Sequence, residues 1–588
     1  MLKSYRALVV ILLLAIAAVA CDLGESTSST PVPAATSTPE LPDNTIEVSI
    51  IYAPESELYM VTAIEEFNQA YLEGRNPVTG QALAADEAPI FVDGRTGSSG
   101  TVMQGIVNAF IAPNNENVER PTIFAPSVSH WLALANFQVG REVFDLANSP
   151  ATANAPVVMA IWESRLQAIQ NANPDDPIGW SHLLDVLNNP DGWAGYGVPG
   201  DRTTVYYGHT DPFISSTALS TLIAEYYASA QANGIDVRRL DMDTVRDSDV
   251  QEGVRDIENL IRHYSSRTTE FKEYIAQGPS YLDFVALEEN DLIYINQGKT
   301  EYQPPERLVA LYPAEGTFWH EHPFGIVQAD WVSPEQAEAA EVFTEFILSV
   351  PIQERVMENG FRPVNPDVEI GYPISTDLGV DPQQPLTVLE VPEPEVISAI
   401  QESWSFVKKQ ADIWLVIDVS GSMFGEKLDN AKAAALNFIE QTEANNRVGL
   451  ITFSNNPQVI VPLDNVESNG AELRNAINRL QADGDTALFD AIVESVDNMA
   501  ASESERIRAV VLLSDGADTV GSTTRQQAID RILEEAGSQN PVVVIPIAYG
   551  SDADIATLNA IARAANTRVQ PGDPDEIQAL LELISSYF

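Results

Sequence analysis

Residues 413–422 read Ile-Trp-Leu-Val-Ile-Asp-Val-Ser-Gly-Ser. The first five side chains are all apolar, which is typical of a strand that is buried on both faces of a sheet. Asp418, Ser420 and Ser422 follow at once, so the strand ends in one carboxylate and two hydroxyls. In open α/β sheets, ligands bind beyond the carboxyl ends of the strands. This stretch therefore predicts an α/β sheet with ligand groups at one edge.

Helical and strand patterns alternate from this strand to the C-terminus. We expect helices at 428–441, 471–480, 488–499, 522–536, 555–565 and 575–587, and strands at 447–453, 458–463, 508–514 and 542–548. Apolar strands that alternate with helices form a mostly parallel sheet with helices on both faces. The short connection between the strands at 447–453 and 458–463 favours a hairpin. Residues 405–588 are therefore predicted to form one doubly wound, Rossmann-like domain.

Two other segments carry oxygen ligands to the same predicted edge. Thr486 lies on a loop just before a predicted helix, and Asp515 directly follows a buried strand. With Asp418, Ser420 and Ser422 they make a set of five oxygen-bearing side chains. Hard oxygen donors suit Mg²⁺, and also Mn²⁺ or Ca²⁺. Because few of these donors are charged, a carboxylate from outside the chain can complete the coordination shell.

In order, spacing and flanking strands, these five residues resemble the metal-ion-dependent adhesion site of von Willebrand factor type A (VWA) domains. The resemblance implies that the two serines and the threonine coordinate the cation directly, and that the two aspartates bind it directly or through water. It also implies a protein partner that supplies an Asp or Glu as the last ligand. Two alternatives stay open: a VWA scaffold whose site is empty or only structural, and aspartates that merely cap helices.

Residues 46–365 show a second alternation, with expected strands at 45–52, 89–93, 121–125 and 156–161 and a helix at 56–71. Three motifs stand out: Gly97-Ser-Ser-Gly100, Gly208-His-Thr-Asp-Pro212 and Gly360-Phe-Arg-Pro363. With these motifs the region resembles the extracellular solute-binding proteins of ABC transporters. The resemblance implies a two-lobed α/β fold of the periplasmic-binding type and the capture of a small solute between the lobes.

Hydroxyl residues at predicted helix starts suggest an oxyanion as that solute, because helix N-termini offer free N–H groups and a positive dipole end. The candidate ligand-binding residues are Ser98, Ser99, Thr101, Ser127, Ser215, Ser216 and Thr217. The alternative is that they are ordinary N-caps, where Ser and Thr are preferred. His209, His320 and His322 lack the helical spacing of a zinc motif, so we expect no zinc site built from these three.

The N-terminus predicts export. Residues 1–20 combine a basic start with a short apolar run and small residues before Cys21, which indicates a signal peptide. Its end resembles a lipoprotein signal, which implies that Cys21 is lipidated and holds the chain to the outer face of the cell membrane. An ordinary signal peptide followed by a stray cysteine is the alternative. Residues 21–45 are expected to be a Ser/Thr/Pro-rich tether, and 366–404 a linker or a peripheral wrap.

Composition narrows the function classes. The chain has 32 Lys+Arg against 85 Asp+Glu, a formal net charge of −53, which disfavours binding to nucleic acid phosphates. We find no motif that indicates an enzyme. The sequence predicts a surface-anchored binding lipoprotein that recognises a protein partner through its VWA cation. The alternatives are solute capture or sensing with the VWA domain as a docking module, and a scaffold in which neither site is filled.

Overall fold

The computed structural model describes residues 42 and 44–581, except 85–86, 115–117, 200–204, 260, 266–267, 503–505, 516–517, 537–541, 551–552, 566, 568, 573–576 and 578–580. The predicted signal peptide, Cys21 and nearly all of the tether lie outside these residues. Within the part that is described, no helix is both long and apolar enough to cross a membrane.

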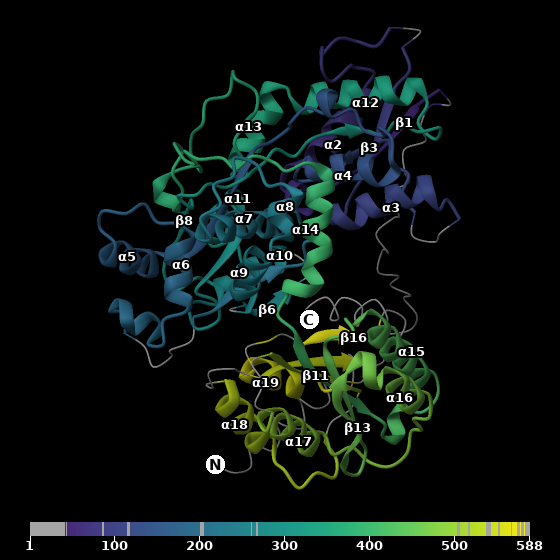
Figure 1. Cartoon of the computed structure of the whole chain (residues 1–588). Coiled ribbons are helices and arrows are strands. Elements are labelled where there is room, and N and C mark those ends of the chain that lie inside the picture. Colours follow the sequence, from purple (N-terminus) through teal and green to yellow (C-terminus); the bar gives the residue numbers. More distant parts are fainter. Residues whose placement is uncertain are drawn as a thin grey trace, which may run out of the picture. The chain divides into compact units, whose positions relative to one another are not determined.

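The first lobe of the N-terminal region is built on a four-stranded sheet (Figure 1). Strand β1 (Ile46–Tyr52) pairs in parallel with β2 (Ile90–Thr96) and β3 (Ile123–Ala125), and β10 (Gly325–Ile326) pairs antiparallel with β3. Its helices are α2 (Glu57–Leu72), α3 (Ser99–Ile111), α4 (His130–Val139), α12 (Pro334–Ile347) and α13 (Val350–Glu358). Aromatic rings join the early and late segments, since Phe67 lies 5.0 Å from Phe343 between ring centroids. The lobe is thus made from two separated stretches of chain.

The second lobe has a mixed sheet in the order β6-β5-β7-β4-β8, with β9 beside β4. Its strands are β4 (Ala155–Trp162), β5 (Tyr207–Thr210), β6 (Ile261–Ser265), β7 (Phe284–Glu288), β8 (Leu308–Leu311) and β9 (Trp319–His320). Its helices are α5 (Glu163–Ala172), α6 (Trp180–Leu187), α7 (Ser216–Ala232), α8 (Met242–Arg246), α9 (Ser248–Asn259), α10 (Thr268–Ala276) and α11 (Glu289–Asn296). The expected two-lobed α/β architecture is confirmed.

The two lobes touch at the N-termini of α3 and α7. The N–H of Gly100 donates a hydrogen bond of 3.1 Å to the carbonyl oxygen of Ile214. A Cβ at position 100 would lie only 1.9 Å from the carbonyl oxygen of Phe213, so the backbones approach this closely only because residue 100 is glycine. Contact between the lobes therefore explains why residue 100, the last of the Gly97–Gly100 motif, is glycine.

Helix α14 (Pro394–Val407) occupies the end of the segment expected as linker or wrap. It packs on α4, α7, α8 and α9. The hydroxyl oxygens of Tyr226 and Ser403 lie 2.5 Å apart, and the Gln401 amide donates to the carbonyl of Pro212 at 2.8 Å. A peripheral wrap therefore describes this part of the segment better than a free linker.

The C-terminal domain has one six-stranded sheet in the order β13-β12-β11-β14-β15-β16 (Figure 1). Its strands are β11 (Ala411–Asp418), β12 (Arg447–Phe453), β13 (Pro457–Asn465), β14 (Ile507–Ser514), β15 (Val542–Tyr549) and β16 (Gln570–Gly572). All neighbours are parallel except β12 and β13, which form the expected antiparallel hairpin.

Among the residues that the structure describes, the helices that accompany this sheet are α15 (Glu426–Gln441), α16 (Val466–Asn478), α17 (Leu488–Ala500), α18 (Arg525–Ala536) and α19 (Ile555–Ala564). Every residue of β11, β14 and β15 is buried, as their apolar runs predicted. The doubly wound fold is therefore confirmed. The helix expected at 575–587 falls mostly outside the described residues.

Candidate functional site

Asp418 lies at the carboxyl end of β11, beside the end of the parallel strand β14. It is fully buried, and both of its carboxylate oxygens are engaged. Oδ1 accepts a hydrogen bond of 2.9 Å from the N–H of Ser420, and Oδ2 accepts one of 2.7 Å from the hydroxyl of Ser514. The strand end thus fixes the orientation of this carboxylate. The sequence analysis did not single out Ser514, although it is the last residue of its strand.

The two serines form a short chain of hydrogen bonds with Asp515. The Ser420 and Ser422 hydroxyl oxygens lie 3.0 Å apart, and the Ser422 hydroxyl donates to Oδ1 of Asp515 at 2.7 Å. A single 3₁₀ turn, Gly421–Met423, presents both hydroxyls on the same side. The structure therefore brings together Asp418, Ser420, Ser422 and Asp515 at the predicted edge.

Thr486 reaches this edge on a loop that is bound to the serine turn. The N–H of Gly421 donates to the carbonyl of Gly484 at 2.9 Å, and the N–H of Asp483 donates to the carbonyl of Val419 at 2.9 Å. Gly484 has a φ of +87°, which favours glycine at this bend. Thr486 is buried two residues later. All five predicted residues consequently belong to one edge of the sheet.

Lys427 is a member of the site that the sequence analysis missed. From the first turn of α15, its Nζ donates to Oδ2 of Asp515 at 2.6 Å, and the aspartate is fully buried. One sequence signal was available: a lysine in the first turn of a helix opposes the helix dipole, so it needs a nearby anion. Asp515 therefore already attracts a positive charge.

The donor set of this edge fits a hard divalent cation. It offers three hydroxyls and two carboxylates, and no nitrogen or sulfur ligand among the five residues. Burial raises the pKa of Asp418, although hydrogen bonds from Ser420 and Ser514 oppose that rise, and the negative charge of Asp515 adds to it. A cation at this edge would favour the ionised form of Asp418.

The seven predicted ligand residues of the N-terminal region are not gathered in one place. Ser99 and Ser127 do meet, because the N–H of Ser127 donates to the Ser99 hydroxyl at 3.3 Å. The Ser127 hydroxyl in turn donates to the buried carboxylate of Glu55 at 3.4 Å. Ser98 precedes α3 without a side-chain capping bond, and Thr101 is exposed. Burial raises the pKa of Glu55 to about 7, so this carboxyl group disfavours a second anion beside Ser127 at and above neutral pH, by charge repulsion.

The other three predicted residues open helix α7. The Ser215 hydroxyl caps the helix by accepting from the N–H of Ala218 at 3.3 Å. The Ser216 hydroxyl accepts from the Trp131 ring N–H at 2.9 Å, and Thr217 is buried. These contacts match the N-cap alternative for Ser215 and a packing role for Ser216.

His320 and His322 hold a buried carboxylate, that of Glu288. His320 Nδ1 and His322 Nε2 lie 2.7 and 3.2 Å from its two oxygens. Their other ring nitrogens meet the hydroxyls of Ser220 at 2.9 Å and Ser56 at 3.0 Å. Burial alone would raise the pKa of Glu288, but the two histidines outweigh it and lower the pKa to about 2. Protein partners thus account for both histidines, and the structure places His209 in a different cluster.

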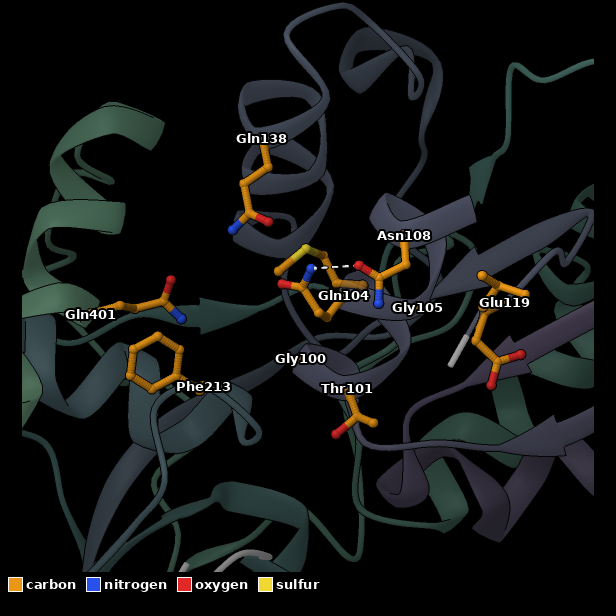
Figure 2. Close-up of a pocket in the computed structure, with 11 residues that line it drawn as sticks. Gly100, Thr101, Gln104, Gly105, Asn108, Glu119, Gln138, Phe213 and Gln401 are labelled. Atoms are coloured by element: carbon orange, nitrogen blue, oxygen red, sulfur yellow. Dashed lines mark hydrogen bonds between the residues drawn. The ribbon is translucent and has the colours of Figure 1, made fainter. Parts of the chain in front are cut away.

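A pocket of about 540 Å³ lies beside α3 (Figure 2). Much of its lining is neutral and polar: Thr101, Gln104, Asn108, Gln138 and Gln401. The pocket also includes Phe213, from the loop that touches Gly100. Only Thr101 of the predicted ligand residues borders it, and Glu119, its one charged lining residue among those described, pairs with Arg95 at 2.5 Å. The lining therefore suits hydrogen bonding to a neutral solute more than charge pairing.

Both halves of the chain match known protein families. Residues 412–582 match the von Willebrand factor type A domain family, and residues 134–378 match the family described as bacterial extracellular solute-binding protein. An uncharacterized protein of Synechocystis sp. is 30% identical over 154 residues, which cover 26% of this chain and 36% of that protein. Inter-alpha-trypsin inhibitor heavy chain H6 of Homo sapiens is 26% identical over 164 residues, or 26% of this chain and 12% of that protein.

The chain therefore spans well under half of the length of these two relatives. Among solved structures, a periplasmic thiamin binding protein overlaps 61% of this chain and 94% of its own, at 11% identity and a TM-score of 0.39. By family model, the chain contains a match to bacterial extracellular solute-binding proteins over residues 134–378 and a match to the von Willebrand factor type A domain over residues 412–582.

Proposed function

We propose that this chain is an exported binding protein whose VWA domain holds a divalent cation and uses it to recognise an acidic side chain of a protein partner. Mg²⁺ is the first choice of cation, with Mn²⁺ or Ca²⁺ as alternatives. The observation that carries the proposal is the convergence of Ser420, Ser422 and Asp515 in one hydrogen-bonded chain beside Asp418. Lipidation of Cys21 would hold the protein at the outer face of the membrane.

In this proposal the residues of the edge coordinate the cation and leave one coordination position for the partner. The three hydroxyls of Ser420, Ser422 and Thr486 are neutral, so a divalent cation held mainly by them keeps positive charge for an outside carboxylate. When bound, the cation would supply that electrostatic attraction. Phe424, next to the serine turn, is 81% exposed and offers an apolar contact for the same partner.

The test is capture of binding partners by the purified chain from surface extracts of its own cells, with and without a chelator. We expect Mg²⁺-dependent capture that Asp418→Asn removes, while circular dichroism shows an unchanged fold. Asp464→Asn is the matched control, because Asp464 is exposed on β13 and is not one of the five residues. Capture that persists both in chelator and in Asp418→Asn would refute the proposal.

Solute capture or sensing by the N-terminal region is the second candidate function, with the VWA domain as the docking module. The matched solute-binding family and the amide-lined pocket of Figure 2 favour it. The seven Ser and Thr residues suggested an oxyanion, but the pocket lining favours a neutral solute with several hydroxyl or amide groups.

Thermal unfolding with a solute panel tests this candidate. A ligand at about a hundredfold excess over its Kd should stabilise the fold by about 2.7 kcal/mol. Gln104→Ala should reduce the shift because it removes an amide from the pocket wall. Sulfate and phosphate belong in the panel, and a shift with them alone would favour the oxyanion prediction instead.

A further inference from the structure

Three buried side chains of the second lobe point one ligand atom each at a common space. His209 comes from β5, Glu225 from α7 and Glu258 from α9. The candidate ligand atoms of all three lie within 4.8 Å of one another. His209 is 2% exposed and the two glutamates are 0% exposed. This cluster belongs neither to the pocket beside α3 nor to the VWA edge, the sheet edge that carries Asp418, Ser420, Ser422, Thr486 and Asp515.

The carboxyl groups of Glu225 and Glu258 can hydrogen-bond to each other only when they share a proton. Outside that contact, each of the three side chains of the cluster keeps one polar atom without a hydrogen-bond partner. These atoms are His209 Nε2, Glu225 Oε2 and Glu258 Oε1. Within the described residues, neither carboxylate has an ion pair with a lysine or arginine. Buried polar atoms are nearly always satisfied, so three such atoms in one cluster require an explanation.

The other polar atom of each side chain is hydrogen-bonded to the protein, as is usual for residues that bind a metal. His209 Nδ1 lies 2.6 Å from the carbonyl oxygen of Thr210, which can only accept, so Nδ1 carries the proton and Nε2 presents its lone pair. The Tyr207 hydroxyl donates to Glu225 Oε1 at 3.2 Å, and the Tyr264 hydroxyl donates to Glu258 Oε2 at 2.6 Å. Backbone carbonyls and hydroxyls that orient the far side of a ligand are typical of the surroundings of metal sites.

We propose that His209, Glu225 and Glu258 form a buried site for a divalent transition-metal ion, with Zn²⁺ as the best fit. Two carboxylates balance the charge of one divalent ion, which removes the penalty of burying two anions side by side. One imidazole nitrogen with two carboxylate oxygens suits Zn²⁺ better than Mg²⁺ or Ca²⁺, which prefer oxygen alone. Aromatic rings of Trp404 and Tyr264 flank His209, at 5.2 and 6.3 Å between centroids, and help to shield the site from water.

Such an ion would fasten a strand to two helices that are distant in sequence. His320 and His322 are bound to Glu288 and take no part in this site. The proposal departs from the sequence analysis at His209, where zinc was not expected. The new site combines His209 with residues that no sequence motif connects to it.

The experiment measures metal content in the full chain carrying Asp418→Asn, with excess Mg²⁺ to occupy oxygen-only sites. The protein is stripped with a chelator, loaded with Zn²⁺ or Mn²⁺, desalted and analysed by mass spectrometry of the metal. We expect about one Zn²⁺ per chain and a higher Tm after loading. Adding Glu225→Gln and Glu258→Gln should remove at least about nine-tenths of the bound zinc and the whole Tm shift.

His130→Gln is the matched control, because His130 is also buried with both ring nitrogens unpartnered but belongs to no such cluster among the described residues. It should leave zinc content unchanged. The double glutamine variant should fold without metal, since it removes two buried charges, and its metal-free Tm checks this. Equal zinc content in the double variant and its parent would overturn the proposal, as would a parent that retains neither metal after loading.

Discussion

The VWA edge and the neighbouring carboxylates Glu288 and Glu289 of the N-terminal region hold buried carboxylates in different ways. At the VWA edge, Asp418 is held by neutral hydrogen-bond donors, and the only Lys or Arg paired with Asp515 among the described residues is Lys427, on a partly exposed stem. In the two-lobed region, Glu288 lies between two buried histidines and Glu289 is gripped by a buried arginine. Both sets of carboxylates are buried. In the second set each carboxylate has buried partners on both of its oxygens, whereas in the first set Asp418 has only neutral donors and Asp515 has a lysine on one oxygen.

Under the proposed function, this difference separates carboxylates that stabilise the fold from carboxylates that can bind a cation. Where the fold supplies a rigid positive partner, the carboxylate is already neutralised, so an added cation gains little and the ion pair serves the structure. Where the partners are mainly hydroxyls, a cation can replace hydrogen bonds among the ligands themselves. The following three changes test this distinction, from the largest expected effect to the smallest.

Arg362→Met should destabilise the two-lobed region most. Arg362 donates to both oxygens of Glu289, at 2.8 and 2.7 Å, and both side chains are buried. Loss of one partner from a buried pair costs about 3–5 kcal/mol, whereas replacing both with apolar residues is often nearly neutral. Urea unfolding of the single variant and of Arg362→Met with Glu289→Met measures both effects.

The exposed pair of Arg75 and Glu73 provides the control for this comparison. Arg75→Met should change the unfolding free energy by less than about 1 kcal/mol, because both side chains are about half exposed. A similar loss from Arg362→Met and Arg75→Met would mean that the buried pair is not a fixed part of the fold.

Glu55→Gln should stabilise the chain at pH 8 but not at pH 5. Burial, and the charges of Glu288 and Asp291, raise the pKa of Glu55 from 4.5 to about 7. A carboxyl with a raised folded pKa weakens the fold as pH rises from 4.5 through 7, because the folded state resists ionisation. The gain at pH 8 should be on the order of 2 kcal/mol, and Glu57→Gln, an exposed neighbour, should show none. A pH-independent effect of Glu55→Gln would contradict this account.

His322 contributes in the same direction at higher pH. Burial lowers the pKa of His322, but Glu288 outweighs burial and raises it above 6.5. The stability that protonated His322 contributes is complete below 6.5 and is lost as pH rises through the raised value. Glu288 acts on the acid side, because its stabilising effect is lost as pH falls from 4.5 towards 2.

Asp418→Asn should have the smallest effect on the fold when a chelator is present. Burial raises the pKa of Asp418, so its ionised form opposes folding at neutral pH, and the neutral amide removes that cost at the expense of one accepted hydrogen bond. The variant should therefore be close to the wild type in stability. The same variant should lose all stabilisation by Mg²⁺. Thermal unfolding at pH 7 with and without Mg²⁺ measures both quantities. Marked destabilisation in chelator would show that Asp418 is structural, like Glu288.

The fold was largely predictable because buried strands and helices have recognisable patterns of apolar residues. The runs at 413–418 and 508–514 are apolar at every position that the sheet covers on both faces. The five residues of the VWA edge were found for a related reason. Each one follows a strand or precedes a helix, so local patterns were enough to place it at the edge.

Other features depend on contacts that local patterns do not encode. Helix α14 follows a proline-rich segment, and only its packing on the second lobe distinguishes it from a linker. His209, Glu225 and Glu258 lie on three different elements, and their meeting depends on how those elements pack. Glu55 beside Ser127 likewise joins distant segments, which is why the anion hypothesis did not anticipate a carboxylate there.

The Lys427 ammonium has a consequence for the binding equilibrium of a cation at the VWA edge. A side chain tethered in the first turn of α15 meets Asp515 at a fixed, high effective concentration, unlike an ion from solution. Any dissolved cation that binds Asp515 must displace the Lys427 ammonium. This competition lowers the apparent affinity of the edge for the cation, although the ligand residues are unchanged. A neutral residue at position 427 would remove this competition. Under the proposed function, Lys427 therefore raises the ion concentration that is needed to fill the edge.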